Sequence, residues 1–469
     1  MSEDVRNGQS ILGNLGAHQF DRRKMLRTGL QVGAALGVPG LAGLTVIGGP
    51  GEAIAQDDPT IDPSAPEWEP SAEPRSPRKY RWEPLAEGQS ATPTGLQVRT
   101  IGLGVSVQDR FLNEFERRTG HSTSGKVTTL TAMITEWLAG GAQSYDTNET
   151  NANRNAALWD TGLLQPIPVE QVIPWQYARD TYTSKEALGY DPVSGYPLVE
   201  VWVDPDNQTE FKLVPQFYNC DSIGYRYDLI GEDITSWGAL LDEKYAGKVA
   251  ILNDSLLTPG WAAGYLSKSG QIEIARTDNM THEELDQVID FLIEKKRAGQ
   301  FRAIWEDYGQ CVNLLASGEA WITDAWNPVV EDVKKQDVVC KYAFPEEGFT
   351  AWYHGIAVQK DTPNLEAALD YINFCLEGWW GSQVALQGYY SPTTTCDVYL
   401  ETTRNTSEDF TDYEWWYQGG SSPDPKEGWP LTGRDTGAYD RRWANLMHWM
   451  TWPDDPDYYA TRWNDFLSA

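Results

Sequence analysis

From Leu96 onward, short apolar runs alternate with segments in which apolar residues recur every three or four positions. The first kind of segment predicts β-strands, and the second predicts amphipathic helices. Strands are expected at residues 96–105, 248–254, 319–326 and 352–358. Helices are expected at residues 108–120, 131–141, 155–167, 281–299 and 364–380, and Thr281 and Glu284 fit a capping box. This alternation is typical of a sheet covered by helices, so the sequence predicts an α/β fold.

The strand at residues 352–358 carries an unusual combination of side chains. Its alternation places Trp352 and His354 on one face and Tyr353 on the other. A strand in the core seldom needs a histidine, because a buried polar group costs free energy unless it is hydrogen-bonded. We therefore expect Trp352 and His354 to line a ligand cleft. If His354 contacts the ligand, affinity should vary with pH between about 6 and 7, where imidazole titrates.

The first 55 residues have the order of an export signal. Arg22 and Arg23 precede a weakly apolar, glycine-rich stretch, and the small residues Ala53 and Ala55 follow it. This order predicts a twin-arginine signal peptide over residues 1–55. A membrane anchor is the alternative, but the many glycines make a poor spanning helix. We expect a soluble periplasmic protein without a lipid anchor, because no cysteine lies near the cleavage site.

The remaining chain is long enough for two or more domains. Residues 56–95 are rich in Pro, Ser, Glu and Asp, which predicts a flexible leader. Residues 96–214 are expected to form lobe 1, and residues 352–400 to return to it. Residues 215–351 are expected to form lobe 2, and residues 401–469 a C-terminal helical extension that packs on the lobes.

The composition limits the partners and cofactors. A formal net charge of −31 argues against nucleic acid and against anionic membranes as partners. An acidic surface steers cations inward, but its simplest role is to keep the protein soluble. The five cysteines form no CxxC pair, so at least one is unpaired within the chain, and one or two disulfides stay open. The histidines are scattered, and we infer no metal and no other cofactor.

Several segments resemble periplasmic solute-binding proteins of the spermidine/putrescine type. Residues 234–254, ITSWGALLDEKYAGKVAILND, resemble that family's Ser-Trp, Leu and Tyr-x-Gly-Lys signature before a strand. Residues 111–120, 144–167, 318–327 and 346–376 resemble further family segments in the same order. The resemblance implies two lobes, each a mixed sheet flanked by helices, joined by crossing hinge strands. It also implies a monomer that closes on a small solute and delivers it to the membrane permease of an ABC importer.

The resemblance supplies the candidate ligand-binding residues. Trp326 and Trp352 match the family's box tryptophans, and Asp254 matches one carboxylate, although packing or helix capping would also explain these residues. His354 stands where the family has its main amine-binding aspartate. The remaining candidates are Asn151 and Asn153 in an asparagine-rich run, Tyr390 with Tyr389 as its rival in the GYYSPT loop, and Tyr218 beside a crossing strand.

Three ligand classes stay open. A polyamine fits the family, but Leu257 stands where a second carboxylate is expected. One carboxylate with two tryptophans suits a solute with a single cation. His354, Asn151 and Asn153 suit an oxygen-rich solute such as a carboxylate or polyol. The sequence has no GxSxG, P-loop or HExxH motif, so we expect no enzyme, with a secreted carbohydrate-active hydrolase or a cell-surface interaction protein as the alternatives.

Overall fold

The computed structural model describes residues 88–402 and 439–469. The predicted signal peptide, most of the predicted leader and the first part of the C-terminal extension lie outside these residues. Among the helices of the described part, none is both long and apolar enough to cross a bilayer.

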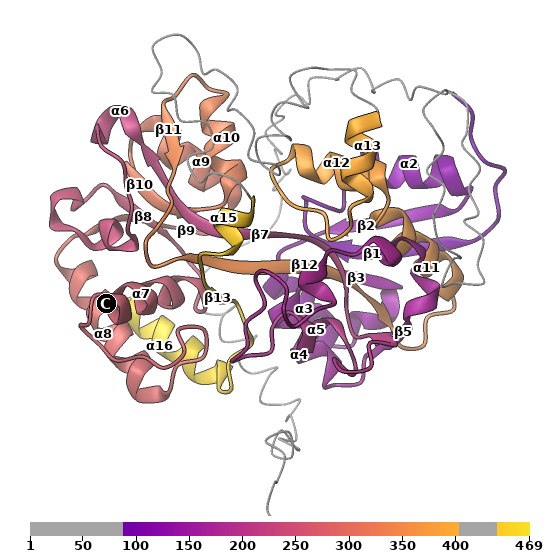
Figure 1. The fold of residues 1–469 in the computed structure, drawn as a ribbon, viewed down its shortest axis with the longest axis horizontal. Coiled ribbons are helices and arrows are strands. Elements are labelled where there is room, and N and C mark those ends of the chain that lie inside the picture. The colour runs from indigo at the N-terminus through magenta and orange to yellow at the C-terminus, as the bar shows by residue number, and fades with distance from the viewer. Residues whose placement is uncertain (1–87, 403–438) are drawn as a thin grey trace, which may run out of the picture.

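The described chain folds into two α/β lobes that share one mixed sheet (Figure 1). The strand order along the sheet is β2-β1-β3-β12-β7-β10-β8-β9. Lobe 1, on the right, contains β1 (Gln97–Gly102), β2 (Ser122–Val127) and β3 (Thr147–Asn151). Lobe 2, on the left, contains β8 (Val249–Leu252), β9 (Phe301–Trp305), β10 (Ile322–Ala325) and β11 (Cys340–Tyr342). The long strands β7 (Val214–Arg226) and β12 (Phe349–Gln359) run between the lobes.

Helices flank the sheet in both lobes. Lobe 1 has α2 (Asp109–Thr119), α3 (Leu130–Leu138), α4 (Ala152–Trp159), α11 (Leu365–Cys375), α12 (Gly378–Leu386) and α13 (Thr395–Thr402). Lobe 2 has α6 (Tyr227–Ile230), α7 (Leu257–Lys268), α8 (His282–Arg297), α9 (Tyr308–Ser317) and α10 (Asn327–Lys334). The short elements β4 (Leu164–Gln165), β5 (Ile167–Pro168), α5 (Leu198–Val201) and β6 (Glu210–Phe211) lie between α4 and β7.

The four predicted strands are all present, and the capping box of α8 forms as expected. The helix expected at residues 155–167 is wrong in its bounds: α4 begins at Ala152 and ends at Trp159. The helix expected at residues 364–380 breaks into α11 and α12. The hydroxyls of Thr393 and Thr395 donate to the carbonyl of Leu376, at 3.1 and 2.8 Å, which satisfies a backbone group at this break.

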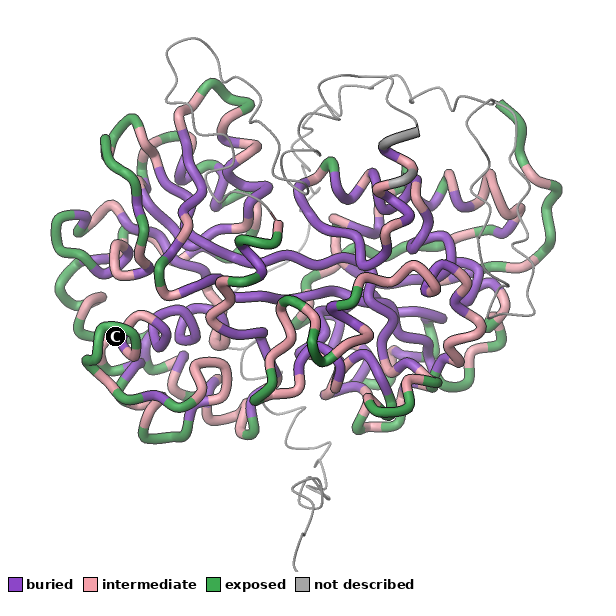
Figure 2. The backbone as a smooth tube through the Cα atoms, viewed as in Figure 1, coloured by how far each residue is buried: buried purple, intermediate pink, exposed green. Residues whose placement is uncertain are grey.

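The crossing strands form the most buried part of the sheet (Figure 2). Every residue of β12 is buried, and all of β7 except Arg226. The two strands pair antiparallel from Thr350 opposite Asp221 to Ile356 opposite Val214. Such pairing fixes which side chains share each face of the ribbon, because side chains alternate along a strand.

The C-terminal segment covers one face of the crossing strands. It contains α15 (Tyr439–Trp443), β13 (Leu446–Trp449) and α16 (Pro456–Ser468), so the extension that was expected to be helical also contains a strand. β13 pairs parallel with β12, and α16 packs on α8 of lobe 2. The ring of Trp443 lies 5.1 Å from Tyr218 and 5.5 Å from Trp449. This aromatic layer therefore supports the back of the hinge strands.

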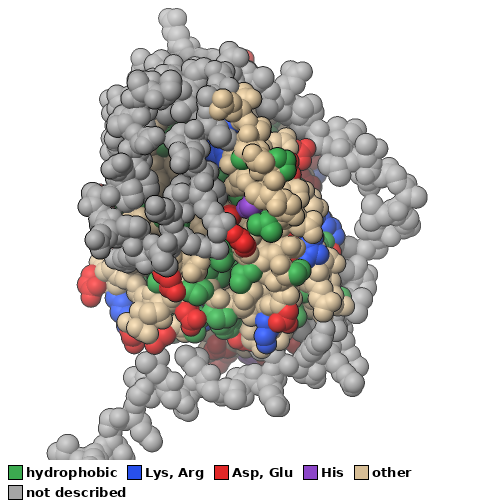
Figure 3. Space-filling view, turned by 90° about the vertical axis from the view of Figure 1, so that its right-hand side faces the viewer, with side chains coloured by type: hydrophobic (Ala, Val, Ile, Leu, Met, Phe, Trp, Pro, Cys, Tyr) green, Lys and Arg blue, Asp and Glu red, His purple; other side chains and the backbone are tan. Residues whose placement is uncertain are grey.

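The cysteines and the surface charges can be compared with what the sequence predicts for disulfides and for partners. All five cysteines are buried and none belongs to a disulfide, so the bridges that the sequence left open are not present in this structure. On the face of lobe 1 in Figure 3, Lys and Arg side chains are scattered among Asp and Glu. The described atoms of this face form no broad basic patch, which agrees with the acidic net charge of −31. The scattered basic side chains of this face and the acidic net charge do not favour a polyanionic partner.

Replacing Trp443 by Ala should lower the free energy of unfolding by about 3–5 kcal/mol, because a fully packed indole would be lost from behind the hinge strands. Urea denaturation followed by circular dichroism measures this change. Val193 is 72% exposed and provides the control, since its replacement by Ala should leave stability nearly unchanged. A loss of less than about 1 kcal/mol for Trp443→Ala would show that the aromatic layer does not support the hinge.

Candidate functional site

The front face of the crossing strands carries the predicted strand motif. Trp352 and His354 share this face, and Tyr353 lies on the back, as the alternation predicts. The imidazole of His354 stacks on Phe217 of β7, with 4.8 Å between ring centroids. The Trp352 ring meets His354 edge-on at 5.4 Å. The front face is thus an aromatic floor between the lobes.

A buried carboxyl group, Asp221 of β7, lies on the same floor. It is 2% exposed, and one oxygen accepts a hydrogen bond of 2.6 Å from the indole nitrogen of Trp352. Burial raises the pKa of Asp221 well above its usual range, and the nearby Asp324 and Asp254 raise it further. The indole of Trp326 also donates to this carboxyl and opposes the rise in pKa. Within the described residues, no Lys, Arg or His forms an ion pair with Asp221.

An ion pair joins the two lobes beside this floor. Arg154 in the first turn of α4 donates to the Oδ2 atom of Asp254, which precedes α7, at 2.8 Å. The other oxygen, Oδ1, accepts the backbone N–H groups of Leu256 and Leu257 at 2.8 and 3.0 Å. Asp254 therefore caps α7 and also holds a cation from the opposite lobe.

His354 is a neutral member of the site. Burial lowers the pKa of its imidazole to about 3, and the positive charge of Arg154 contributes to the decrease. The expected titration of His354 between pH 6 and 7 is therefore wrong, because desolvation disfavours the imidazolium ion. The Nδ1 atom of His354 has no hydrogen-bond partner among the described residues.

Six side chains close into a ring between the lobes, which we call the interlobe ring. Its members are Asp221, Trp352, His354, Arg154, Asp254 and Trp326. Trp352 donates to Asp221 and contacts His354, and Arg154 acts electrostatically on His354 and pairs with Asp254. Asp254 and Trp326 each act on Asp221. Lobe 1 supplies Arg154, lobe 2 supplies Asp254 and Trp326, and the crossing strands supply the rest.

Further aromatic rings flank the interlobe ring. Trp326 meets Trp305 edge-on at 5.1 Å and lies parallel to Tyr308 at 6.4 Å. Tyr389, rather than Tyr390, faces the floor, with its ring 6.0 Å from Trp352 and 5.3 Å from Phe217. These rings offer flat apolar surfaces and π faces to a small guest.

Buried polar atoms without a partner also gather near the interlobe ring. Both side-chain polar atoms of Asn153 and of Asn327, and the hydroxyl of Thr350, have no hydrogen-bond partner in the described protein. Each such group costs about 1–3 kcal/mol when it is left unpaired. Asn151 pairs with His354 across the strands, and its side chain accepts the backbone N–H of Asn153 at 3.3 Å. The asparagine run thus places one capping residue and one unpaired amide beside Arg154.

The structure does not bring Tyr218 and Tyr390 to the front face, where the other candidates Trp352 and His354 lie. The Tyr218 hydroxyl bonds to that of Tyr439 at 2.7 Å, and the Tyr390 hydroxyl accepts from Arg442. Both tyrosines alternate with residues of the front face and pack against the C-terminal segment instead.

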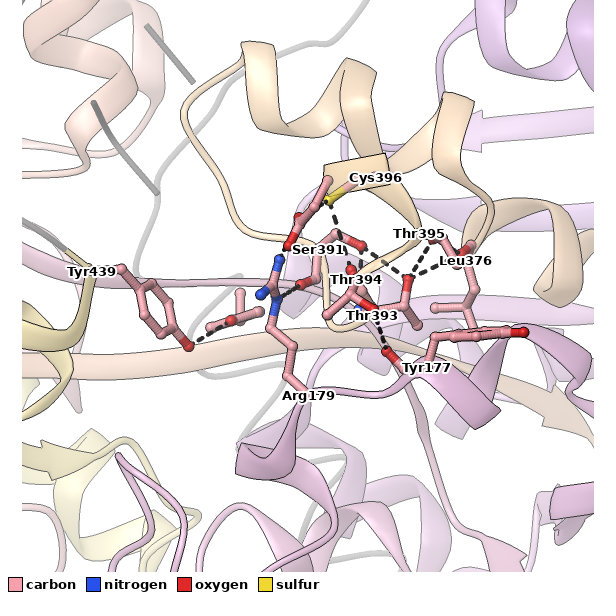
Figure 4. Close-up of polar contacts among 11 residues, drawn as sticks. Tyr177, Arg179, Leu376, Ser391, Thr393, Thr394, Thr395, Cys396 and Tyr439 are labelled. Carbon is pink, nitrogen blue, oxygen red and sulfur yellow. Dashed lines mark hydrogen bonds and ion pairs between the residues drawn. The ribbon is translucent and has the colours of Figure 1, made fainter. Parts of the chain in front are cut away.

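A polar network holds the loop that carries Tyr389 and Tyr390 (Figure 4). Arg179 donates to the carbonyl of Ser391 at 2.8 Å and to the carboxylate of Asp397 at 2.7 Å. The backbone N–H of Thr394 donates to the carbonyl of Tyr177 at 2.9 Å. These contacts fix the loop to lobe 1 and so help to hold Tyr389 against Trp352.

The sequence reasoning missed Asp221, Arg154 and Tyr308. Asp221 follows Tyr218 by three positions in the crossing strand, so alternation would have placed it on the opposite face from Tyr218. Arg154 lies inside the asparagine run that the sequence singled out, but nothing in the sequence shows that its side chain reaches across to Asp254. The stacking of Tyr308 on Trp326 depends on tertiary packing.

Residues 114–397 match the family described as bacterial extracellular solute-binding protein. The chain belongs to this family. It is 23% identical over 209 residues to the spermidine/putrescine-binding periplasmic protein 1 of Haemophilus influenzae, which covers 44% of this chain and 53% of that protein. It is 26% identical over 191 residues to the spermidine/putrescine-binding periplasmic protein of Salmonella typhimurium, which covers 40% of this chain and 51% of that protein. The chain thus spans about half the length of these curated relatives.

A solved structure shares the two-lobe architecture. The spermidine/putrescine ABC transporter substrate-binding protein PotD from Streptococcus pneumoniae superposes with a TM-score of 0.53 at 15% identity. The superposition covers 80% of this chain and 98% of that chain. The predicted family and the predicted two-lobe solute-binding fold are therefore confirmed.

The pKa of His354 gives a test of the site that needs no ligand. Because burial lowers this pKa to about 3, the imidazole should stay neutral and its NMR resonances should not shift between about pH 5 and 8. The His354→Gln variant assigns the signal by its loss. A midpoint for His354 near the ordinary value of about 6.5 would contradict its burial in the interlobe ring.

Proposed function

We propose that the protein is an exported receptor that captures a small organic cation in the interlobe ring and delivers it to the membrane permease of an ABC importer. The observation that carries the proposal is Asp221. Its carboxyl group is buried between the lobes, accepts hydrogen bonds from Trp352 and Trp326, and has no cationic partner among the described residues. A guest with a positive charge would supply that partner.

The chemistry around Asp221 suits an ammonium group. A buried carboxylate is unfavourable unless an opposite charge compensates it. A cation over a tryptophan or tyrosine face gains about 0.5–2 kcal/mol, and the rings of Trp352, Trp326 and Tyr389 surround the carboxyl. The net charge of −31 would also favour the approach of a cation by long-range attraction.

An anionic solute fits the site less well. Arg154 is the cation of the interlobe ring, but it already forms a close ion pair with Asp254. A carboxylate guest would have to break that pair and would face the Asp221 carboxyl at the same time. The amides of Asn153 and Asn327 and the neutral His354 would instead bind uncharged polar groups on the rest of a cationic solute.

The polyamine names of the curated relatives support the same class of ligand, since polyamines are organic cations. The hydrolase alternative has no support. Glycoside hydrolysis needs two carboxyl groups as acid and base or nucleophile. Asp254 is occupied by Arg154 and by the N-terminus of α7, which leaves Asp221 without such a second group in the interlobe ring.

Capture would proceed by closure of the lobes around the hinge strands. β7 and β12 connect the lobes, and the Arg154–Asp254 pair joins them at the interlobe ring. A guest that contacts both lobes favours the closed arrangement over the open one. Export by a twin-arginine signal, a periplasmic location and a monomeric state belong to this proposal and follow from the sequence.

Isothermal titration calorimetry of the mature chain against amines, quaternary ammonium compounds, amino acids, carboxylates and sugars tests this function. At least one cationic compound should bind without being altered. The double variant Trp326→Ala/Trp352→Ala should weaken that binding at least about tenfold, because two aromatic walls and two donors to Asp221 are lost. Its circular dichroism spectrum should match that of the unmodified protein.

Trp321 provides a matched control for the double variant. It precedes β10, whereas Trp326 follows that strand, so Trp321→Ala removes an indole from the opposite end of the same element. This control should bind the cation with unchanged affinity. Binding only of anions or sugars, or equal affinity in the double variant and the unmodified protein, would refute the proposed function.

A further inference from the structure

We infer that Arg154 restricts the solute to a single positive charge at the interlobe ring. This inference deepens the proposed function and rests on it. Of the three carboxyl groups that interact at this site, Asp324 already accepts N–H groups from Leu252 and Trp261, which leaves Asp221 and Asp254 to hold an ammonium group. Arg154 forms a close ion pair with Asp254, so that only Asp221 remains for the solute.

The two carboxyl groups differ in how fully they are already satisfied. Asp254 accepts the Arg154 guanidinium on one oxygen and two backbone N–H groups on the other. It also lies at the N-terminus of α7, where the helix dipole favours its negative charge. Asp221 accepts only indole N–H groups, from Trp352 and Trp326. Asp221 is therefore the carboxyl group of this pair that lacks a cationic partner, and one cation would supply it.

The surroundings of Arg154 fix the position of its guanidinium group beside Asp254. Its side chain is 15% exposed, and that of Asp254 is 19% exposed, so bulk water screens the pair weakly. The residue belongs to the first turn of α4, whose N-terminus is capped by Asn151 on the end of β3. The guanidinium also lies close enough to His354 to act on it electrostatically, which places its charge on the floor of the site.

A second ammonium group would therefore meet a like charge rather than a free carboxylate. A diamine that places one end at Asp221 must bring its other end toward Arg154 or leave it unpaired in a buried site. Both arrangements are unfavourable. The polyamine-binding proteins that this chain resembles take dications and larger polycations according to their names, so the inference separates this chain from them.

Matched pairs of alkylamines and α,ω-diamines with three to six carbons provide the test. In calorimetric titrations, the unmodified protein should bind each monoamine at least about tenfold more tightly than the diamine of equal length. The Arg154→Met variant keeps an unbranched side chain but removes the charge and releases one oxygen of Asp254. Its affinity for at least one diamine, relative to that for the monoamine of equal length, should rise about tenfold or more over the unmodified protein.

Two further variants keep the result specific. Arg302 of β9 pairs with Glu319 at 2.6 Å on the surface of lobe 2, so Arg302→Met makes the same change in net charge and should not alter diamine affinity. The double variant Arg154→Met/Asp254→Asn should lose the gain in diamine affinity, because Asn still caps α7 but carries no charge. Thermal unfolding of each variant shows whether the fold is retained.

The outcomes separate this inference from the proposed function. Unmodified protein that binds diamines as tightly as monoamines would overturn the role of Arg154 and leave the function standing. Arg154→Met with unchanged diamine affinity, or a gain that persists in the double variant, would also overturn it. If no amine binds to the unmodified protein or to Arg154→Met, the cationic solute and the inference fail together.

Discussion

The burial of one carboxyl group between two lobes is the constraint on which the rest of the structure depends. Asp221 lies on a strand that passes from one lobe to the other, and it is 2% exposed. Water cannot solvate it there, and no cation of the described chain pairs with it. A crossing strand and lobe 2 supply the indole N–H groups that donate to this carboxyl.

The crossing strands separate two tasks by the alternation of their side chains. The front face presents Trp352, His354 and Asp221 to the space between the lobes. The back face presents Tyr218 and Tyr353 to an aromatic layer that the C-terminal segment completes. Because both faces belong to the same two strands, packing on the back face fixes the positions of Trp352, His354 and Asp221 on the front face.

The order of elements and the family could be predicted from the sequence, because apolar periodicity and spaced motifs are local signals. Strand alternation also predicted that Trp352 and His354 share one face of β12. Which tyrosine faces the interlobe ring could not be predicted in the same way. Tyr389 and Tyr390 are adjacent, and only the pairing of their loop with Tyr218 of β7 decides between them.

The charges of the site depend on contacts between segments far apart in the chain. Asp254 was expected to bind the solute, but its ion pair with Arg154 forms across 100 positions of sequence. The neutral state of His354 follows from burial that the strand pattern alone does not reveal. The face on which a side chain lies can be inferred from a sequence pattern, whereas the protonation state of a buried side chain depends on all of the groups around it.

The protons exchanged on binding test the role of Asp221 most directly. Butan-1-amine stays protonated below about pH 8, so any proton released near pH 6 comes from the protein. Titrations in buffers of different ionisation enthalpy should show proton release on binding, because the cation lowers the raised pKa of Asp221, and affinity should increase as the pH rises. Binding without proton release between about pH 5 and 7 would contradict a carboxyl group whose raised pKa falls when the guest binds.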